Sequence, residues 1–379
     1  MAIARKFSIE ETVSAGFAVA GVIFVFSVTG MLRWFNHVIP TAVIKGIQVG
    51  AGLSLVLSAG SSLLQPLGWT TPSSPDNLLW ALFAFITLLL TQKSPRVPYA
   101  LLIFVLGLVL AIFTVGWHHL PYIHLWDPTT FVPSWSAFKT GALDAGLGQI
   151  PLTTLNSIIA VSYLSADLLP HIPAPGVTSI GISVALMNLI GGWFGAMPVC
   201  HGSGGLAAQY RFGARSGASI VVLGVFKIIL GLLFGGSLVA LLREYPKSLL
   251  GVMVIAAGLE LAKVGESLNY GARDLWEASE DSGPGGDSSR QEGLKQQRHL
   301  SDEERKERWM VMFMTIAGLL AFKNDGVGFV AGMMCHLTYR LSDAWTEWEC
   351  QKRTDSARSR TSRQVTTIAD EEEQLLLDE

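Results

Sequence analysis

The chain has 379 residues, with 27 basic and 30 acidic side chains, so its formal net charge is −3. Half of the residues are apolar and only 15% are charged, whereas a soluble domain carries about 25% charged residues. This composition excludes a soluble globular enzyme. The lack of a basic excess excludes a nucleic-acid binder, and three cysteines are too few for a disulfide scaffold.

Apolar stretches of about 20 residues, long enough to cross a bilayer, recur along the chain. The ten stretches are, in order, Thr12–Leu32, Gly46–Gln65, Leu78–Gln92, Val97–Trp117, Ala145–Ala166, Gly176–Met197, Ser216–Leu242, Leu249–Ala262, Trp309–Phe322 and Val327–Leu341. Too many of them are apolar on every face to be buried helices of a soluble protein. The sequence therefore predicts an all-α polytopic membrane protein.

The distribution of charge divides the chain into four parts. Residues 1–263 form a nearly uncharged transmembrane core, and residues 264–308 read as a disordered cytoplasmic linker. Residues 309–341 supply the last two transmembrane helices, and residues 342–379 form a polar cytoplasmic tail. This division places most of the charged residues outside the membrane.

Basic residues in short connections predict the orientation of the helices. Arg33 and Lys45 flank the first connection, and Lys93 and Arg96 lie in the third, so both connections are expected in the cytoplasm. The second connection, residues 66–77, has no Lys or Arg and is expected on the opposite side.

The stretch Met197–Gly217 looks like a helix broken at membrane depth, which is tolerated only around a cavity. Pro198 ends one element, and a helix then begins at Ser203 or Gly205, with Ser203 as a candidate cap. Free N–H groups at such a helix start suit an anion. A glycine-rich loop with packing value only is the alternative. The residues predicted here are His201, Gly202, Ser203, Gly204, Gly205, Gln209 and Arg211.

Arg211 and Arg215 are four residues apart and are expected to share a helix face. They could add positive field at the anion site. The favoured interpretation is that they mark the membrane exit, because basic residues commonly gather on the cytoplasmic side.

A second stretch, Gly146–Ser165, places amides and hydroxyls where lipid would reject them. Pro151 fits a first helical turn. Neutral donors suit an anion with many oxygens, although hydrogen bonds between helices are the commoner role of Ser and Thr. The predicted lining residues are Gln149, Thr154, Asn156 and Ser157, with Thr153 a weaker candidate.

Other chemistry is disfavoured. Cys200 and His201 lack a third orienting group and further ligands, so neither catalysis nor a metal site is predicted. No G-x-x-x-x-G-K-[ST] loop is present, so ATP drive within this chain is not expected, and no cofactor is implied. Glu260 and His201 are the candidates for proton coupling.

Three long strings carry a family resemblance: PVCHGSGGLAAQYRFGARSG from Pro198, IPTAVIKGIQVGAGL at Ile39–Leu53, and GQIPLTTLNSIIAVSYLSADLLP at Gly148–Pro170. They closely resemble the molybdate transporter family within the sulfate-permease superfamily. The similarity runs along about the first 260 residues and the terminal helix pair.

The resemblance implies a seven-plus-seven inverted-repeat transporter fold, in which two half-helices meet at the midplane and bind an oxyanion. Met197–Arg211 would be the half-helix of the second repeat, and Gly148–Pro170 its first helix. The family's matching PVQPMK-type block in the first repeat has no counterpart here. The chain is therefore expected to lack the first three segments of repeat one.

The end of the chain, DEEEQLLLDE, resembles an acidic dileucine sorting signal formed by Glu371, Leu375 and Leu376. It would direct the protein to a vacuolar or endosomal membrane through a sorting adaptor. A solvated acidic tail in a plasma-membrane protein is the alternative.

Together these features predict a secondary active transporter of molybdate that works by alternating access within a lipid bilayer. Sulfate or another oxyanion is the nearest alternative substrate, since sulfate is also a tetrahedral dianion. A truncated, non-transporting membrane paralogue is the rival of another class, and a membrane enzyme using Cys200 and His201 is a third. A homodimer is a further arrangement to consider.

Overall fold

The computed structural model describes residues 7–91, 97–116, 121–169, 171–270, 272–278 and 295–377. The first half of this part contains α2 (Ile9–Val28), α3 (Met31–Val38), α4 (Thr41–Ala59) with the π-helical turn η1 (Gly60–Leu64), α5 (Leu78–Thr91), α6 (Tyr99–Val115), α7 (Trp135–Thr140), η3 (Gly141–Gly146), α8 (Leu147–Leu152), η4 (Thr153–Ile159) and α9 (Ala160–Leu168). The second half contains α10 (Val177–Gly192), α11 (Ser203–Arg211), α12 (Gly217–Phe234), α13 (Ser237–Arg243), α14 (Lys247–Lys263), η5 (Val264–Leu268), η6 (Arg273–Leu275), β1 (Trp276–Ala278), β2 (Lys295–Gln297), α15 (Asp302–Phe322) and α16 (Asp325–Leu377).

The helices have the length and composition of membrane spans. Among the described residues, four helices are long and apolar enough to cross a bilayer: Ile9–Val28, Thr41–Leu64, Gly217–Phe234 and Lys247–Leu268. Three shorter apolar helices accompany them: α5, α6 and α10. Each of the ten predicted stretches overlaps a helix. The prediction of one unbroken segment over Ser216–Leu242 is wrong, because the backbone turns at Gly235, with φ of 49°, between α12 and α13.

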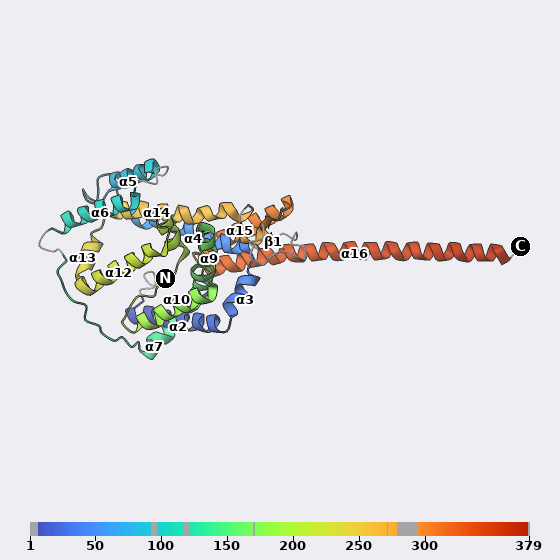
Figure 1. Cartoon of the computed structure of the whole chain (residues 1–379), viewed down its shortest axis with the longest axis horizontal. Helices are drawn as coiled ribbons and strands as arrows, with labels where there is room; N and C mark the ends of the chain where they lie inside the picture. The colour runs from blue at the N-terminus through green and yellow to red at the C-terminus, as the bar shows by residue number, and fades with distance from the viewer. Residues whose placement is uncertain are drawn as a thin grey trace, which may run out of the picture.

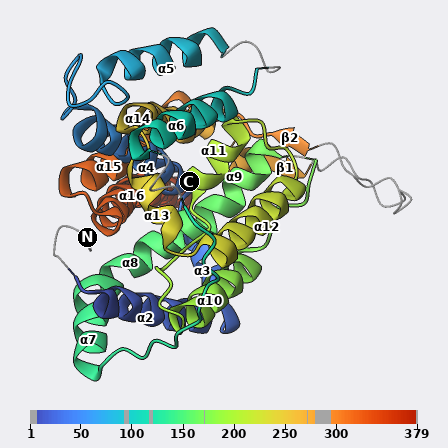
Figure 2. The ribbon, with the colours of Figure 1, turned by 90° about the vertical axis from the view of Figure 1, so that its left-hand side faces the viewer.

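The helices pack in two groups joined by a central layer. In the first group α2 lies along α10, with α3, α7, η3 and α8 around them. In the second group α4 lies between α14 and α15, and α16 packs along α15. In Figure 2 the first group lies below and the second above, with α9 and α11 beside the second. The π segment η4 contacts both α4 and α10 and forms the layer between the groups. The largest buried cluster joins the groups, because it contains Ile23, Ile44, Ile158, Val184 and other residues of α2, α4, η4 and α10.

Close helix approach inside the second group depends on glycine. A Cβ atom on Gly52 of α4 would lie 2.5 Å from the carbonyl oxygen of Gly258 in α14. Small residues at such crossings let membrane helices associate through dense packing, because the bilayer provides no hydrophobic drive between them. The α4–α14 pair is therefore fixed by backbone contact.

The prediction of a disordered linker over residues 264–308 is wrong for its two flanks. Residues 264–268 and 273–275 form 3₁₀ turns, β1 pairs antiparallel with β2, and α15 begins at Asp302. Arg308 of α15 holds this flank by donating to the Asp274 carboxylate at 2.5 and 3.2 Å and to the Leu268 carbonyl at 2.9 Å. Residues 279–294 lie outside the described part.

The last predicted span is also longer than expected. The helix containing 327–341 continues as α16 to Leu377, well beyond the helical body (Figure 1). The predicted tail, residues 342–379, is therefore largely helical. The side chains of Glu371, Leu375 and Leu376 lie outside the described residues, so the sorting signal stays a prediction.

Candidate functional site

The predicted break lies between α10 and α11. Residues 196–202 are non-helical, and α11 begins at Ser203. Asn188 of α10 pins this segment: its Nδ2 donates to the Val199 carbonyl at 2.7 Å, and its Oδ1 accepts from the Val199 amide at 2.8 Å. Pro198 packs against Gly16 of α2, where a Cβ would come within 2.6 Å of its Cγ. The Val199 backbone at the break is thus hydrogen-bonded to α10, although residues 196–201 are exposed at the protein surface.

The start of α11 leaves two amides before the first intrahelical bonds. Gly202 is the N-cap, and its carbonyl accepts from the Gly205 and Leu206 amides at 2.9 and 3.4 Å. The amides of Ser203 and Gly204 precede these bonds, so they are the donors that the helix start offers to a ligand. The expectation that Gly205 also keeps an open amide is wrong.

Ser203 has a different role from the predicted cap. Its side chain is fully buried, and its Oγ donates to Oδ1 of Asn156 in the η4 turn. This bond joins the two polar stretches that the sequence analysis treated separately. With Oδ1 engaged, the Nδ2 group of Asn156 remains as a donor beside the start of α11, given the assigned amide orientation.

The helix that carries Asn156 contains a π-helical segment, as polar interruptions in membrane helices often do. Pro151 lies inside α8, and residues 153–159 form η4. A π turn adds a residue and is frequent at functional sites. Thr154 and Ser157 of η4 are 5% and 1% exposed, and Thr154 Oγ1 has no hydrogen-bond partner within the described chain. Both side chains are therefore buried in packed protein, as expected from the alternative interpretation, contact between helices.

A cavity of 270 Å³ lies beside the break. Its walls are Gln149 and Thr153 on one side, residues 197–200 on another, and parts of α2 and α10. At about 30 Å³ per water, it has room for a small hydrated anion. Gln149 and Thr153 therefore face a hollow, whereas Asn156, one to two turns along the same helix, contacts α11 instead.

Of the remaining predicted residues, His201 directly precedes the N-cap of α11, and Gln209 and Arg211 lie at the far end of the helix. His201 Nε2 is 2.9 Å from Ser183 Oγ of α10. Arg211 ends α11, about 12 Å along the axis from Ser203 at 1.5 Å per residue, and its Nε is 3.9 Å from a carboxylate oxygen of Glu260 in α14. Gln209 belongs to the same final turn, where its carbonyl accepts from Ala214 at 2.9 Å.

The prediction that Arg211 and Arg215 share a helix face is wrong, because α11 ends at Arg211. Arg215 folds back over the Tyr210 ring, 3.8 Å from its centroid, and donates to the Tyr210 and Ala214 carbonyls at 2.5 and 2.8 Å. The helix ends early because Gly213 adopts φ of 107°, a left-handed conformation that suits glycine at a helix C-terminus.

Sequence analysis missed Asn188 and Ser183, both inside the apolar stretch Gly176–Met197. A polar amide in such a span is itself a signal, because lipid would reject it. The sequence does not show which backbone groups this amide hydrogen-bonds, because that depends on the fold.

These features define an integral membrane protein whose broken helix meets a polar, π-distorted neighbour. The family described as "Molybdate transporter of MFS superfamily" matches the chain over residues 1–55 and 141–261. Those ranges contain α2, the start of α4, η4, the break and α11. Because the description names the MFS superfamily, the sulfate-permease assignment is not confirmed.

Curated relatives point the same way. Molybdate transporter 2 of Arabidopsis thaliana is 35% identical, in a match that covers 69% of this chain and 64% of that protein. Molybdate transporter 1 of Arabidopsis thaliana is 34% identical, covering 70% and 66%, and that of Chlamydomonas reinhardtii is 48% identical, covering 45% and 34%. The chain thus spans less than two thirds of these relatives' lengths. All three are named transporters, not enzymes.

Proposed function

We propose that this protein transports molybdate across a membrane. The observation that carries the proposal is the start of α11, where Ser203 contacts Asn156 beside open amides, within residues that resemble molybdate transporters. A helix N-terminus offers directed N–H groups and a partial positive charge of about half a unit, which favour a dianion.

The donors proposed for the oxyanion are neutral. The amides of Ser203 and Gly204 and the Asn156 amide group are the donors proposed at the start of α11. Gln149 is a further proposed donor, which lies on the neighbouring 270 Å³ cavity, whose lining does not include these three residues. Ser203 fixes the Asn156 amide instead of needing to reach the anion itself. Arg211 would contribute only field, since it pairs with Glu260 at the far end of α11.

Alternating access is proposed from the two helix groups, which could move relative to each other around the central layer. The seven-plus-seven repeat arrangement belongs to this proposal, as do proton coupling through Glu260 or His201 and a homodimer. Sulfate remains the nearest alternative substrate, because charge and tetrahedral shape are shared. The vacuolar or endosomal address, through Glu371, Leu375 and Leu376, also remains a proposal.

The test is uptake of molybdate by cells that lack their own molybdate transport and express these 379 residues. Ser203→Ala frees the Asn156 amide and is expected to raise KM about tenfold, the loss of roughly 1.4 kcal/mol of binding. The matched control is Ser219→Ala, because that hydroxyl donates only along its own helix start, to the Ser216 carbonyl at 2.7 Å.

Equal surface levels are confirmed by quantitative labelling. Uptake that resists excess sulfate supports molybdate as substrate, whereas uptake abolished by sulfate supports a general oxyanion carrier. No uptake by well-expressed wild-type chain contradicts the proposal and favours a non-transporting membrane paralogue.

A further inference from the structure

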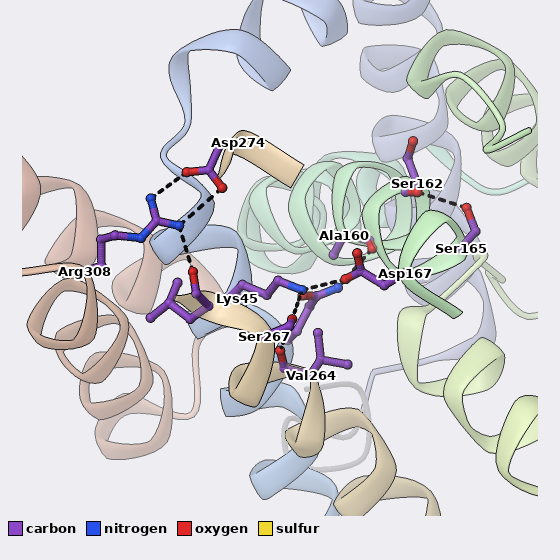
Figure 3. Close-up of polar contacts among 11 residues, drawn as sticks. Lys45, Ala160, Ser162, Ser165, Asp167, Val264, Ser267, Asp274 and Arg308 are labelled. Carbon is purple, nitrogen blue, oxygen red and sulfur yellow. Dashed lines mark hydrogen bonds and ion pairs between the residues drawn. The ribbon is translucent and has the colours of Figure 1, made fainter. Parts of the chain in front are cut away.

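Helix α4 carries two buried polar side chains that both reach the helix containing Asn156. Lys45 is 1% exposed, and its Nζ donates to Asp167 Oδ2 of α9 at 2.6 Å and to Ser267 Oγ of η5 at 2.9 Å. Gln48, also fully buried, donates from Nε2 to the Ala160 carbonyl at 3.0 Å. Figure 3 shows the Lys45, Asp167 and Ser267 contacts side by side.

Lys45 flanks the α3–α4 connection, as the sequence analysis expects, but its side chain is buried. Lys45 lies inside α4, and burying an ammonium costs several kcal/mol unless a partner compensates. Packed apolar residues at such a position often stabilise a protein at least as well as an ion pair. The pair joins a buried Lys45 to an Asp167 side chain that is 24% exposed, so its role lies in fixing position more than in stability.

The contacts of α4 lie along one stripe of residues 147–168. Asn156, Ala160 and Asp167 are separated by four and seven residues, spacings that return to the same helix face. Asn156, the first of these three residues, contacts Ser203. Further along the helix, Gln48 and Lys45 of α4 bind it at two heights, at Ala160 and Asp167.

The position of Ala160 makes the Gln48 contact directional. Ala160 follows the π segment, and its amide donates to the Leu155 carbonyl five residues earlier. A π segment changes both the rotation and the rise of the residues after it. Two fixed contacts on α4 are what is needed to set one rotation and one height for the whole helix.

We propose that Lys45 and Gln48 are positioning residues: they set the height and rotation of the helix 147–168 and thereby place Asn156 against Ser203. The proposal deepens the proposed function and rests on it for the identity of the anion. Lys45 does not touch the anion; it acts through Asp167 and the helix between them.

The first arm compares two double variants by molybdate uptake. Lys45→Met with Asp167→Leu removes both charges together, so the fold and Tm are retained while the directional contact is lost. We expect KM to rise about fivefold at unchanged surface level, because ground-state binding is weakened. The swapped pair, Lys45→Asp with Asp167→Lys, restores the contact and is expected to return KM to within about twofold of wild type.

The second arm needs no substrate. Cys200 is exposed and lines the 270 Å³ cavity opposite Gln149 and Thr153 of the same helix. In a Cys335→Ser, Cys350→Ser background, its rate of maleimide labelling reports the helix position. We expect the apolar pair to change this rate about threefold or more, and the swapped pair to restore it.

The controls separate the outcomes. Lys227→Met removes a lysine from exposed α12 and should leave KM and labelling unchanged. If the charge variants fail to fold, Gln48→Met replaces them, because it removes no charge. It should shift the Cys200 labelling rate in the same direction as the apolar pair. Unchanged Cys200 labelling and KM in folded apolar-pair protein overturn the proposal. Restored labelling without any molybdate transport by wild type keeps the positioning and rejects the proposed function.

Discussion

Glu307 lies on α15 just before its apolar part, outside the predicted span Trp309–Phe322, and beside a cavity of 830 Å³ between α3, α15 and α16. Burial raises the pKa of Glu307 above its ordinary value. The carboxylates of Asp343, Glu304 and Glu303 raise this pKa further, and Arg340 lowers it. The folded structure therefore disfavours the ionised form of Glu307.

We predict that Glu307→Gln raises Tm at pH 7 by about 1–2 °C. Because the pKa is higher in the folded than in the unfolded protein, the folded state binds the proton more tightly. Stability therefore falls as pH rises through the interval between these two pKa values. The gain from Gln should fall close to zero at pH 4, where most of the carboxyl is protonated in both states. Thermal unfolding in detergent at both pH values measures it, and an equal gain at pH 4 would contradict the electrostatic cause.

For single residues, the sequence showed the chemical type of a side chain more reliably than the residues that it contacts. Asn156 and Ser203 are recognisable as polar residues in apolar spans, yet their mutual hydrogen bond joins positions 47 residues apart. The ion pair of Lys45 was not predicted, because the orientation rule uses charge near a span and contains no information on an acid 122 residues later. Periodicity fixes which face a residue occupies, and only packing fixes what that face meets.

Among the elements, the segment between α10 and α11 is held to α10 through the side chain of Asn188. Asn188 contributes bonds to Val199 on both its amide and carbonyl, and another to the Val184 carbonyl at 2.8 Å. Without the Asn188 amide, the N–H and C=O groups of Val199 would lose these hydrogen-bond partners, and non-helical backbone at membrane depth needs such partners.

We predict that Asn188→Ala lowers stability by about 1–3 kcal/mol, because it removes two hydrogen bonds to the Val199 backbone, each with a net contribution of about 0.5–1.5 kcal/mol. The same change should raise the KM for molybdate, since residues 197–200 form a wall of the cavity. Thermal unfolding and uptake at matched surface level measure the two effects. Thr114→Ala is the control, because that hydroxyl donates to its own helix at the Leu110 carbonyl. Wild-type Tm and KM in Asn188→Ala would show that the break is held by other contacts.

Element boundaries show why the sequence prediction was partial. Each long apolar stretch located a helix, because hydrophobic length is a local property, whereas the short α7 lies outside all ten stretches. The flanks of 264–308 were predicted as disorder from their composition, but Leu268, Ala272, Leu275 and Leu300 are buried there. Their order comes from docking under α15, where Arg308 binds Asp274 and Leu268, and composition does not report docking.

Across the whole molecule, the connections collect at two ends. The α3–α4 corner, the β1–β2 ribbon and the start of α15 lie at the end from which α16 extends, whereas the connection before α5 lies toward the other end (Figure 1). The first end carries Arg273, Arg298 and Arg308, while residues 66–77 carry no Lys or Arg. This asymmetry indicates that the end from which α16 extends is cytoplasmic, because connections rich in Lys and Arg are retained in the cytoplasm.

We predict that a cysteine at Ser73 and one at His299 lie on opposite sides of the membrane. Both positions are exposed, so Ser73→Cys and His299→Cys, each in a background with Cys200, Cys335 and Cys350 changed to serine, give equal labelling after permeabilisation. In sealed right-side-out plasma-membrane vesicles, an impermeant maleimide should label position 73 and leave position 299 unlabelled, by about tenfold or more in rate, since the bilayer bars a charged reagent. Inside-out vesicles should reverse the pattern. Labelling of both positions from one side would mean that an odd number of spans does not separate them, and the arrangement of α5, α6 and α12 across the bilayer would have to be redrawn.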